Sequence, residues 1–265
     1  MATEDEEAIV KHHHWLPIIL AIYLPVSFII TYSIAVGNDH VKPGFPYISD
    51  TGTKPPESCV FGQLVNMGAV LGGIIIYIRY KQILKQTTVV KTLNRASFFI
   101  GLLSIFGVSL VGNFEQTSVV VVHLIGAFLA FAVGFVYIIL QTIISFKSTD
   151  LERPGNTPFI RKLRIVLCVV DAIFLILLGV APQVAHSMGP GPGKSKFQWS
   201  PDDPGYAEHL VATISEWLVA FITVIYFATF YAEFRHFKLE APKVVLNEVQ
   251  TMQTSPPTTT TTTTA

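Results

Sequence analysis

The sequence predicts an all-α integral membrane protein, a bundle of six transmembrane helices with both termini in the cytoplasm. Of its 265 residues, 51% are hydrophobic and only 14% are charged, proportions that argue against a soluble globular domain. Six apolar stretches are each long enough to cross the hydrocarbon core as a helix, which is about 30 Å thick and takes about 20 residues. The lysines and arginines are concentrated in alternate loops, which sets the orientation.

The six spans are expected to form one domain between two polar ends. The first stretch contains Pro17 and Pro25, which a membrane helix tolerates when neighbouring groups bond the freed carbonyls. It lacks the basic leader of a secretory signal, so we expect it to be retained. The spans are placed at residues 15–36, 60–80, 96–113, 119–145, 163–183 and 210–231, after a cytoplasmic segment at 1–14 and before a disordered cytoplasmic tail at 232–265 that ends in a threonine run.

The basic residues are divided unequally between the two sides of the bundle. Fourteen of the 18 lysines and arginines fall on the side of the termini, and four fall on the other side. Basic loops stay in the cytoplasm. The segment between the first two spans is therefore predicted to be lumenal or extracellular.

That segment includes "FPYISDTGTKPPESCVFG", which is dense in turn-forming residues. Gly52 is expected to adopt a positive φ, and Pro55 and Pro56 stiffen the approach to the second span. Glu57 fits the first turn of that helix, where a carboxylate meets the positive end of the helix dipole. We interpret the segment as a packed lumenal cap.

Three ionisable side chains fall within or at the start of the expected spans. Buried acids in a membrane are costly and normally face the bundle interior or a wet cavity. One interpretation is a relay for protons or cations; the other, which we favour, is that neighbouring helices hydrogen-bond each group as part of the structure. The three are His123, Asp171 and Glu216.

Basic side chains on the predicted cytoplasmic side are candidates for contact with lipid headgroups. Each such residue contributes about 1 kcal/mol of attraction to an anionic leaflet. Topology alone explains these charges, and specific contact with inositol lipids is the alternative. The candidates are Arg79, Lys81, Lys85, Arg161, Lys162 and Arg164.

The motifs of common enzyme classes are missing from the sequence. It contains no nucleophile elbow, phosphate loop, HExxH motif or CxxC pair. The adjacent histidines His12 to His14 lack the spacing of a closed zinc cage. We therefore expect no enzymatic activity, no cofactor, no metal site and no nucleic-acid partner.

"PYISDTGTKPPES" (Pro46 to Ser58) resembles the signature of the DRAM family, the damage-regulated autophagy modulators, within the wider FRAG/DRAM/SFK superfamily. "VVHLIGAFLAF", "LQTIISFKS" and "EWLVAF" also match in order, within a similarity that runs from about Leu16 to Phe234. The resemblance implies a six-span protein of lysosomal or late endosomal membranes that promotes macroautophagy, in some members linked to stress-induced cell death. It carries over no catalytic residue; the signature positions are Pro46, Ser49, Asp50, Gly52, Pro55, Pro56 and Glu57.

Two other functions stay open from the sequence. One is a transporter or channel that uses the intramembrane acids Asp171 and Glu216 with His123. The other is a plasma-membrane scaffold for inositol-lipid metabolism, as the SFK branch of the superfamily suggests. The expected partners are membrane lipids, anionic inositol lipids among them, and unidentified cytosolic proteins of autophagy or lipid-kinase pathways.

Overall fold

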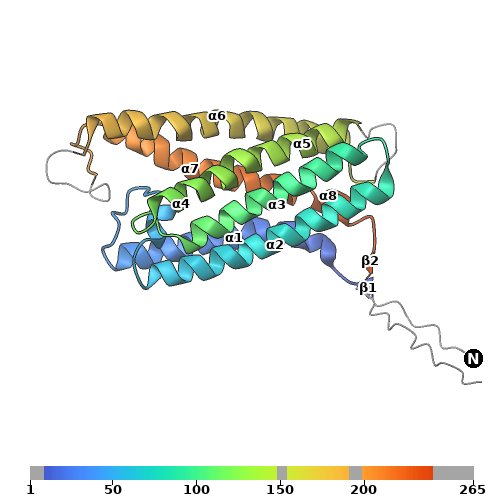
Figure 1. Cartoon of the computed structure of the whole chain (residues 1–265), viewed down its shortest axis with the longest axis horizontal. Coiled ribbons are helices and arrows are strands. Elements are labelled where there is room, and N and C mark those ends of the chain that lie inside the picture. Colours follow the sequence, from blue (N-terminus) through green and yellow to red (C-terminus); the bar gives the residue numbers. More distant parts are fainter. Residues whose placement is uncertain (1–8, 148–153, 191–198, 241–265) are drawn as a thin grey trace, which may run out of the picture.

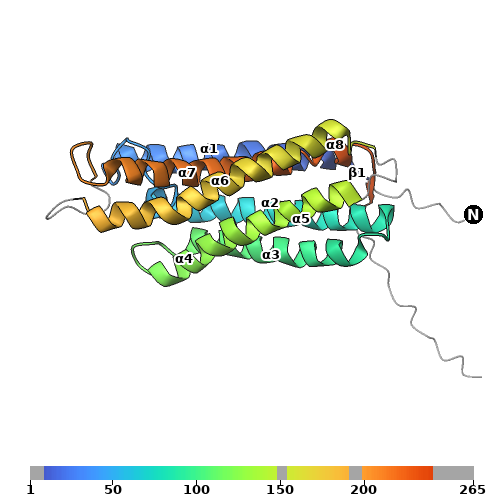
Figure 2. The ribbon, with the colours of Figure 1, turned by 90° about the horizontal axis from the view of Figure 1, so that it is seen from above.

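The computed structural model describes residues 9–147, 154–190 and 199–240. Within these ranges, six helices are long and apolar enough to cross a membrane. They lie side by side in one elongated bundle (Figure 1), and the view turned by 90° shows the same arrangement (Figure 2). The predicted all-α architecture of six spans is confirmed.

Each observed helix coincides with an expected span, and most run about a turn further at their ends. The fourth span is the least regular, because a π-helical segment interrupts its middle. The helices are α1 (Leu16–Gly37), α2 (Glu57–Gln86), α3 (Lys91–Asn113), α4 (Val120–Phe128), η3 (Leu129–Val133, π-helical), α5 (Gly134–Lys147), α6 (Pro158–Met188), α7 (Tyr206–Ala228) and α8 (Tyr231–Phe234). Short elements are β1 (Ile9–Val10), η1 (His13–Trp15), η2 (Ser49–Gly52) and β2 (Leu239–Glu240).

Small residues let neighbouring helices approach closely, as expected for membrane helices. A Cβ atom added at Gly68 of α2 would lie 2.4 Å from the Leu24 side chain of α1. One added at Gly107 of α3 would lie 2.4 Å from Leu129 Cβ and 2.6 Å from the backbone nitrogen of Ala130. These glycines allow α1 to pack closely on α2, and α3 to pack closely on η3.

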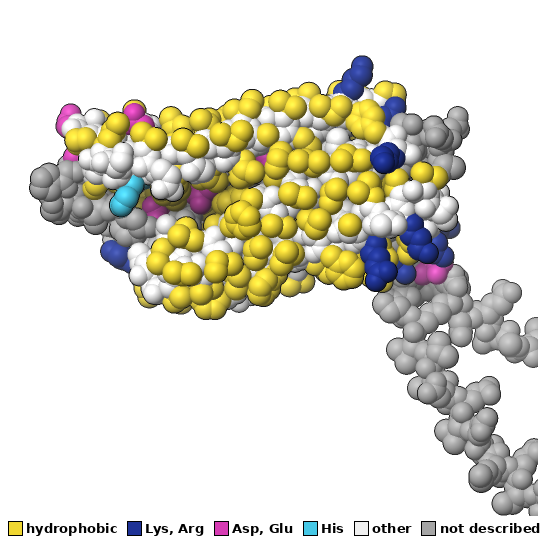
Figure 3. Space-filling model, turned by 45° about the horizontal axis from the view of Figure 1, so that its top comes forward, with side chains coloured by type: hydrophobic (Ala, Val, Ile, Leu, Met, Phe, Trp, Pro, Cys, Tyr) yellow, Lys and Arg dark blue, Asp and Glu magenta, His cyan; other side chains and the backbone are white. Residues whose placement is uncertain are grey.

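Both ends of the described chain leave the bundle at the same end. β1 pairs antiparallel with β2, with Ile9 opposite Glu240 and Val10 opposite Leu239, and Figure 1 shows the two strands together there. Lysines and arginines also gather at this end in Figure 3. We call it the basic end (residues 79–95, 154–164 and 231–240) and the opposite end the signature end (residues 38–56, 114–119 and 199–205). The side of the membrane that each end faces stays a prediction.

The expected boundary of the C-terminal tail at residue 232 is wrong. Residues 232–240 continue as α8 and β2, because Glu233 and Phe234 are buried in the bundle. His13, expected in the cytoplasmic segment at 1–14, is also buried, and its Nε2 lies 3.1 Å from the carbonyl oxygen of Phe234. The remainder of the predicted tail, residues 241–265, lies outside the described residues.

The main core lies in the half of the bundle near the basic end. It brings together side chains from α1, α2, α5, α7 and α8, while exposed Ile, Val, Leu and Phe side chains cover the outer faces of the helices. Figure 3 shows this apolar outer surface along the bundle. The core residues are Leu20, Ile75, Ile76, Ile78, Tyr137, Ile138, Tyr226, Phe227, Phe230 and Phe234.

Replacing Gly107 by alanine should destabilise the bundle, because the added methyl group meets backbone atoms that cannot move aside. The expected loss is about 1–3 kcal/mol, as for other overpacked sites, seen as a lower thermal midpoint in detergent. Gly179→Ala is the matched control, since a Cβ there meets nothing within 4 Å. Equal midpoints for the two variants would contradict the close contact of α3 with η3.

Candidate functional site

The signature segment forms a cap that is bonded to two spans. The indole Nε1 of Trp217 on α7 donates to the carbonyl oxygen of Pro46 at 2.8 Å. The backbone N–H of Ile48 donates to Glu216 Oε2, also on α7, at 2.5 Å. On the other side, the Thr51 and Thr31 hydroxyl oxygens lie 3.1 Å apart, which ties η2 to α1. The cap therefore has defined attachments to α1 and α7.

Gly52 has a different role in the cap from the one expected. Positive-φ glycines in the described part of the chain are Gly155, Gly189 and Gly205, so the prediction of a positive φ at Gly52 is wrong. Its importance is steric: an added Cβ would lie 2.5 Å from the ring of Phe61. Close packing of η2 on the start of α2 thus requires glycine at this position.

Glu57 begins α2, as expected, but its side chain is fully buried and paired with Nδ1 of His40. The pair joins the beginning of the first loop to the start of the second span. Pro56 precedes it at the helix N-cap.

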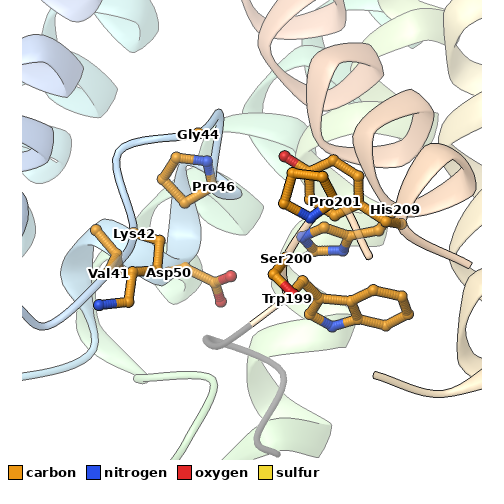
Figure 4. A pocket seen from close by; sticks show the side chains of 10 residues that line it. Val41, Lys42, Gly44, Pro46, Asp50, Trp199, Ser200, Pro201 and His209 are labelled. Carbon is orange, nitrogen blue, oxygen red and sulfur yellow. The ribbon is translucent and has the colours of Figure 1, made fainter. Parts of the chain in front are cut away.

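A shallow pocket of about 240 Å³ lies where the cap meets the last loop of the signature end. Figure 4 shows Asp50 on one side and the rings of Trp199 and His209 on the other. Those two rings are stacked, with centroids 4.7 Å apart and an angle of 5° between their planes. The signature residue Asp50 therefore faces an aromatic wall supplied by a distant part of the sequence.

A larger cleft, of about 570 Å³, lies between the fourth span and α6. We call it the lateral cleft; its walls come from α4 and η3 on one side and from residues 175–183 of α6 on the other. α6 packs mainly on α7 and α5, and the fourth span and α6 diverge towards the signature end in Figure 1. Figure 3 shows a hollow near this end with acidic side chains inside it.

The polar residues of the lateral cleft gather near the cap. His123 and Glu216, at 3% and 7% exposure, both line it. The ring Nδ1 of His123 donates to the carbonyl oxygen of Phe114 at 2.7 Å. Tyr47 and Ser49 of the cap line the same region. Burial and the carboxylates of Glu216 and Asp50 raise the pKa of Tyr47, so its phenol stays protonated and able to donate.

A smaller chamber of about 110 Å³ adjoins the lateral cleft inside the bundle. Side chains of α1, α2, α3 and α7 line it, including Phe28, Phe61 and Val108. The two cavities share five lining residues, Ser49, His123, Ala127, Phe131 and Glu216. The polar side chains beneath the cap, Ser49, His123 and Glu216, therefore lie where the chamber inside the bundle meets the lateral cleft.

Asp171 does not belong to this group. It is fully buried on α6, and neither carboxylate oxygen has a hydrogen-bond partner in the described part of the chain. It is not among the residues that line either cavity. The structure therefore brings together two of the three intramembrane candidates, His123 and Glu216, and leaves Asp171 apart from them.

A second polar site is buried at the basic end. The carboxylate of Glu233 receives Arg79 Nη1 at 2.9 Å on one oxygen and Arg164 Nη2 at 2.6 Å on the other. Both guanidinium groups also lie over the ring of Phe230, at 4.9 and 5.1 Å from its centre. One carboxylate thereby joins α2, α6 and α8.

Neutral side chains satisfy further donors of the two arginines. Arg79 Nε donates to Gln141 Oε1 at 3.0 Å. Arg164 donates to Ser145 Oγ at 2.6 Å and to Thr229 Oγ1 at 2.9 Å. These bonds add α5 and the end of α7 to the network, so it connects four of the six spans and α8.

The assignment of Arg79 and Arg164 to lipid headgroups is wrong. Both have 0% exposure, because the carboxylate of Glu233 that neutralises them and the neutral groups that accept their hydrogen bonds lie inside the bundle. Lys81, Lys85 and Lys162 are exposed at the same end, and Arg161 is half-buried. Sequence reasoning missed Glu233; the signal for it was an acid inside the apolar run "YFATFYAEF".

The fold and these two sites define a multi-pass helical membrane protein with a buried ion network at one end and a cavity open to its side at the other. Residues 12–237 match the Frag1/DRAM/Sfk1/Cwh43P N-terminal domain, and the chain belongs to this family.

Curated relatives extend the match over most of the chain. It is 37% identical over 230 residues to DNA damage-regulated autophagy modulator protein 2 of Mus musculus, covering 85% of each chain. It is 39% identical over 225 residues to modulator protein 1 of Homo sapiens, covering 83% of this chain and 90% of the relative. Identity to the modulator of macroautophagy TMEM150B-A of Xenopus laevis is 33% over 243 residues, which is 89% of this chain and 94% of the relative. No solved structure matches the chain.

Replacing Glu233 by glutamine should strongly destabilise the protein, because two buried arginines would lose their only nearby carboxylate among the described residues. Breaking a buried ion pair by removing one partner costs about 3–5 kcal/mol. The thermal midpoint of the purified protein in detergent measures the effect. The control is Glu240→Gln, a substitution at an exposed position. If the thermal midpoint of Glu233→Gln were as high as that of Glu240→Gln, the network would not be what holds the bundle together.

Proposed function

We propose that this protein is a non-enzymatic, multi-pass membrane regulator that promotes autophagy. The observation that carries the proposal is the similarity to autophagy modulators over at least 83% of the chain. The region that matches the family model, residues 12–237, includes the cap and both ends of the bundle. We place the protein at lysosomal or late endosomal membranes and extend the proposal to a link with stress-induced cell death.

The structure suggests which surface meets cytosolic partners. The interior of the basic end is closed by the network around Glu233, so the groups available there are exposed basic side chains, among them Lys81, Lys85 and Lys162. Charged side chains at such a surface attract anionic lipids and acidic protein segments. We assign the recruitment of cytosolic partners or anionic inositol lipids to this end.

Loss of the protein should lower autophagic flux, and its return at native expression should restore it. Flux is measured as the accumulation of the lipidated autophagosome marker with and without a lysosomal protease inhibitor. Lys81→Glu combined with Lys85→Glu should rescue poorly, because the basic surface is reversed. Lys42→Glu combined with Lys54→Glu, at the signature end, is the matched control and should rescue fully.

Unchanged flux in cells that lack the protein would refute the proposed function. Equal rescue by the two double variants, at equal abundance, would refute the role of the basic end while leaving the function itself in place. Staining of the endogenous protein tests the location separately; confinement to the plasma membrane would contradict a lysosomal or endosomal site.

A further inference from the structure

We propose that the lateral cleft binds a sterol taken up sideways from the bilayer, with the sterol hydroxyl at the polar junction beneath the cap. The inference concerns a ligand site and is independent of the role in autophagy. It rests on the position of the cleft, its size, the charge of its lining and the stiffness of its walls.

The cleft opens where lipid surrounds the protein. Its walls are spans four and five, and Leu124 and Phe128 on α4 are 54% and 63% exposed although they lie within a span. Leu175 and Leu178 line the facing wall on α6. An aqueous solute would gain little from such walls, whereas the apolar body of a lipid matches them. The ligand therefore comes from the membrane.

The size of the cleft fits a compact ligand in one leaflet. On α6 it extends from Leu175 to Gln183, which at 1.5 Å per residue is about 12 Å of helix. One leaflet contributes roughly half of the hydrocarbon core, about 15 Å. The volume of about 570 Å³ falls within the roughly 300–1,000 Å³ of small-molecule sites. A ligand with its polar group near the cap would thus end close to the bilayer centre.

The lining excludes an anionic head group and suits a hydroxyl. Among the described residues that line the cleft, none is Lys or Arg, and Glu216 supplies a carboxylate. A phosphate there would meet like charge without a cation to offset it. A hydroxyl can donate to the carboxylate of Glu216, which also accepts a hydrogen bond from the N–H of Ile48. The hydroxyls of Tyr47 and Ser49 line the same end.

The shape of the walls favours a rigid ligand over flexible acyl chains. Phe128, Phe131 and Pro182 are stiff side chains, and the space beside Gly179 is open, since a Cβ there meets nothing within 4 Å. A rigid ring system loses less conformational freedom on binding than a pair of acyl chains does. The π-helical segment η3, which carries Phe131, is a distortion often found at functional sites. These features point to a sterol over a diacylglycerol.

The test uses the purified full-length protein in lipid nanodiscs with a photoreactive cholesterol analogue, and peptides are mapped by mass spectrometry. Labelling should saturate and fall on residues 124–132 and 175–183. Unlabelled cholesterol should compete, and neither diacylglycerol nor phosphatidylserine should do so. Labelling that does not saturate, or that falls on other residues, would overturn the proposal. So would displacement of the probe by diacylglycerol or phosphatidylserine to the same extent as by cholesterol.

A variant that fills the cleft distinguishes this site from non-specific contact with the bundle surface. Gly179→Phe projects a ring into the open space and should reduce labelling about tenfold or more, a loss of about 1.4 kcal/mol in binding. Gly37→Phe adds the same ring at another position where a Cβ meets nothing within 4 Å, and it should label as the wild type does. Ala132→Leu, on the opposite wall, gives a second variant if Gly179→Phe unfolds. Wild-type labelling in the folded filled variants would refute the site.

Discussion

The bundle depends on the ion pairs between the carboxylate of Glu233 and two buried arginines. The carboxylate holds Arg79 and Arg164, both with 0% exposure, at 2.9 and 2.6 Å. Two buried cations packed between several helices at the basic end would force those helices apart unless an anion and further acceptors met them. Because α8 brings that anion back into the bundle, the sixth span has to continue past residue 231. The largest apolar core packs around the same region, so polar and apolar contacts reinforce each other at the basic end.

The opposite end is built differently, and the difference explains its cavities. There the cap is attached through separate polar contacts, among them the hydrogen bonds from Trp217 to Pro46 and from Ile48 to Glu216. A small apolar cluster around Ile48, Phe61 and Val65 replaces the large core. With α6 held mainly by α7 and α5, α4 and α6 can separate and leave the lateral cleft. The family signature therefore coincides with the part of the molecule where the bundle is least filled.

The spans could be predicted from the sequence because each one is a continuous apolar stretch whose length the bilayer fixes. The position of Glu57 at the start of α2 followed from an equally local rule. The pairing of Glu233 with two arginines did not, since nothing local distinguishes an arginine that turns inward from one that reaches a headgroup. Gly52 was recognised as special for the wrong reason: a glycine that avoids the ring of Phe61, nine residues further along the chain, looks the same in sequence as one with positive φ. Likewise, only the three-dimensional structure separates Asp171 from His123 and Glu216.

The most direct test of this account is an experimental structure of the protein in lipid nanodiscs, determined by electron microscopy. We predict Glu233 between Arg79 and Arg164 inside a closed basic end, with α4 and α6 separated at the signature end and elongated lipid density between them. Side chains of Arg79 and Arg164 extending to the headgroups, or α4 packed directly against α6 along the whole cleft, would contradict it.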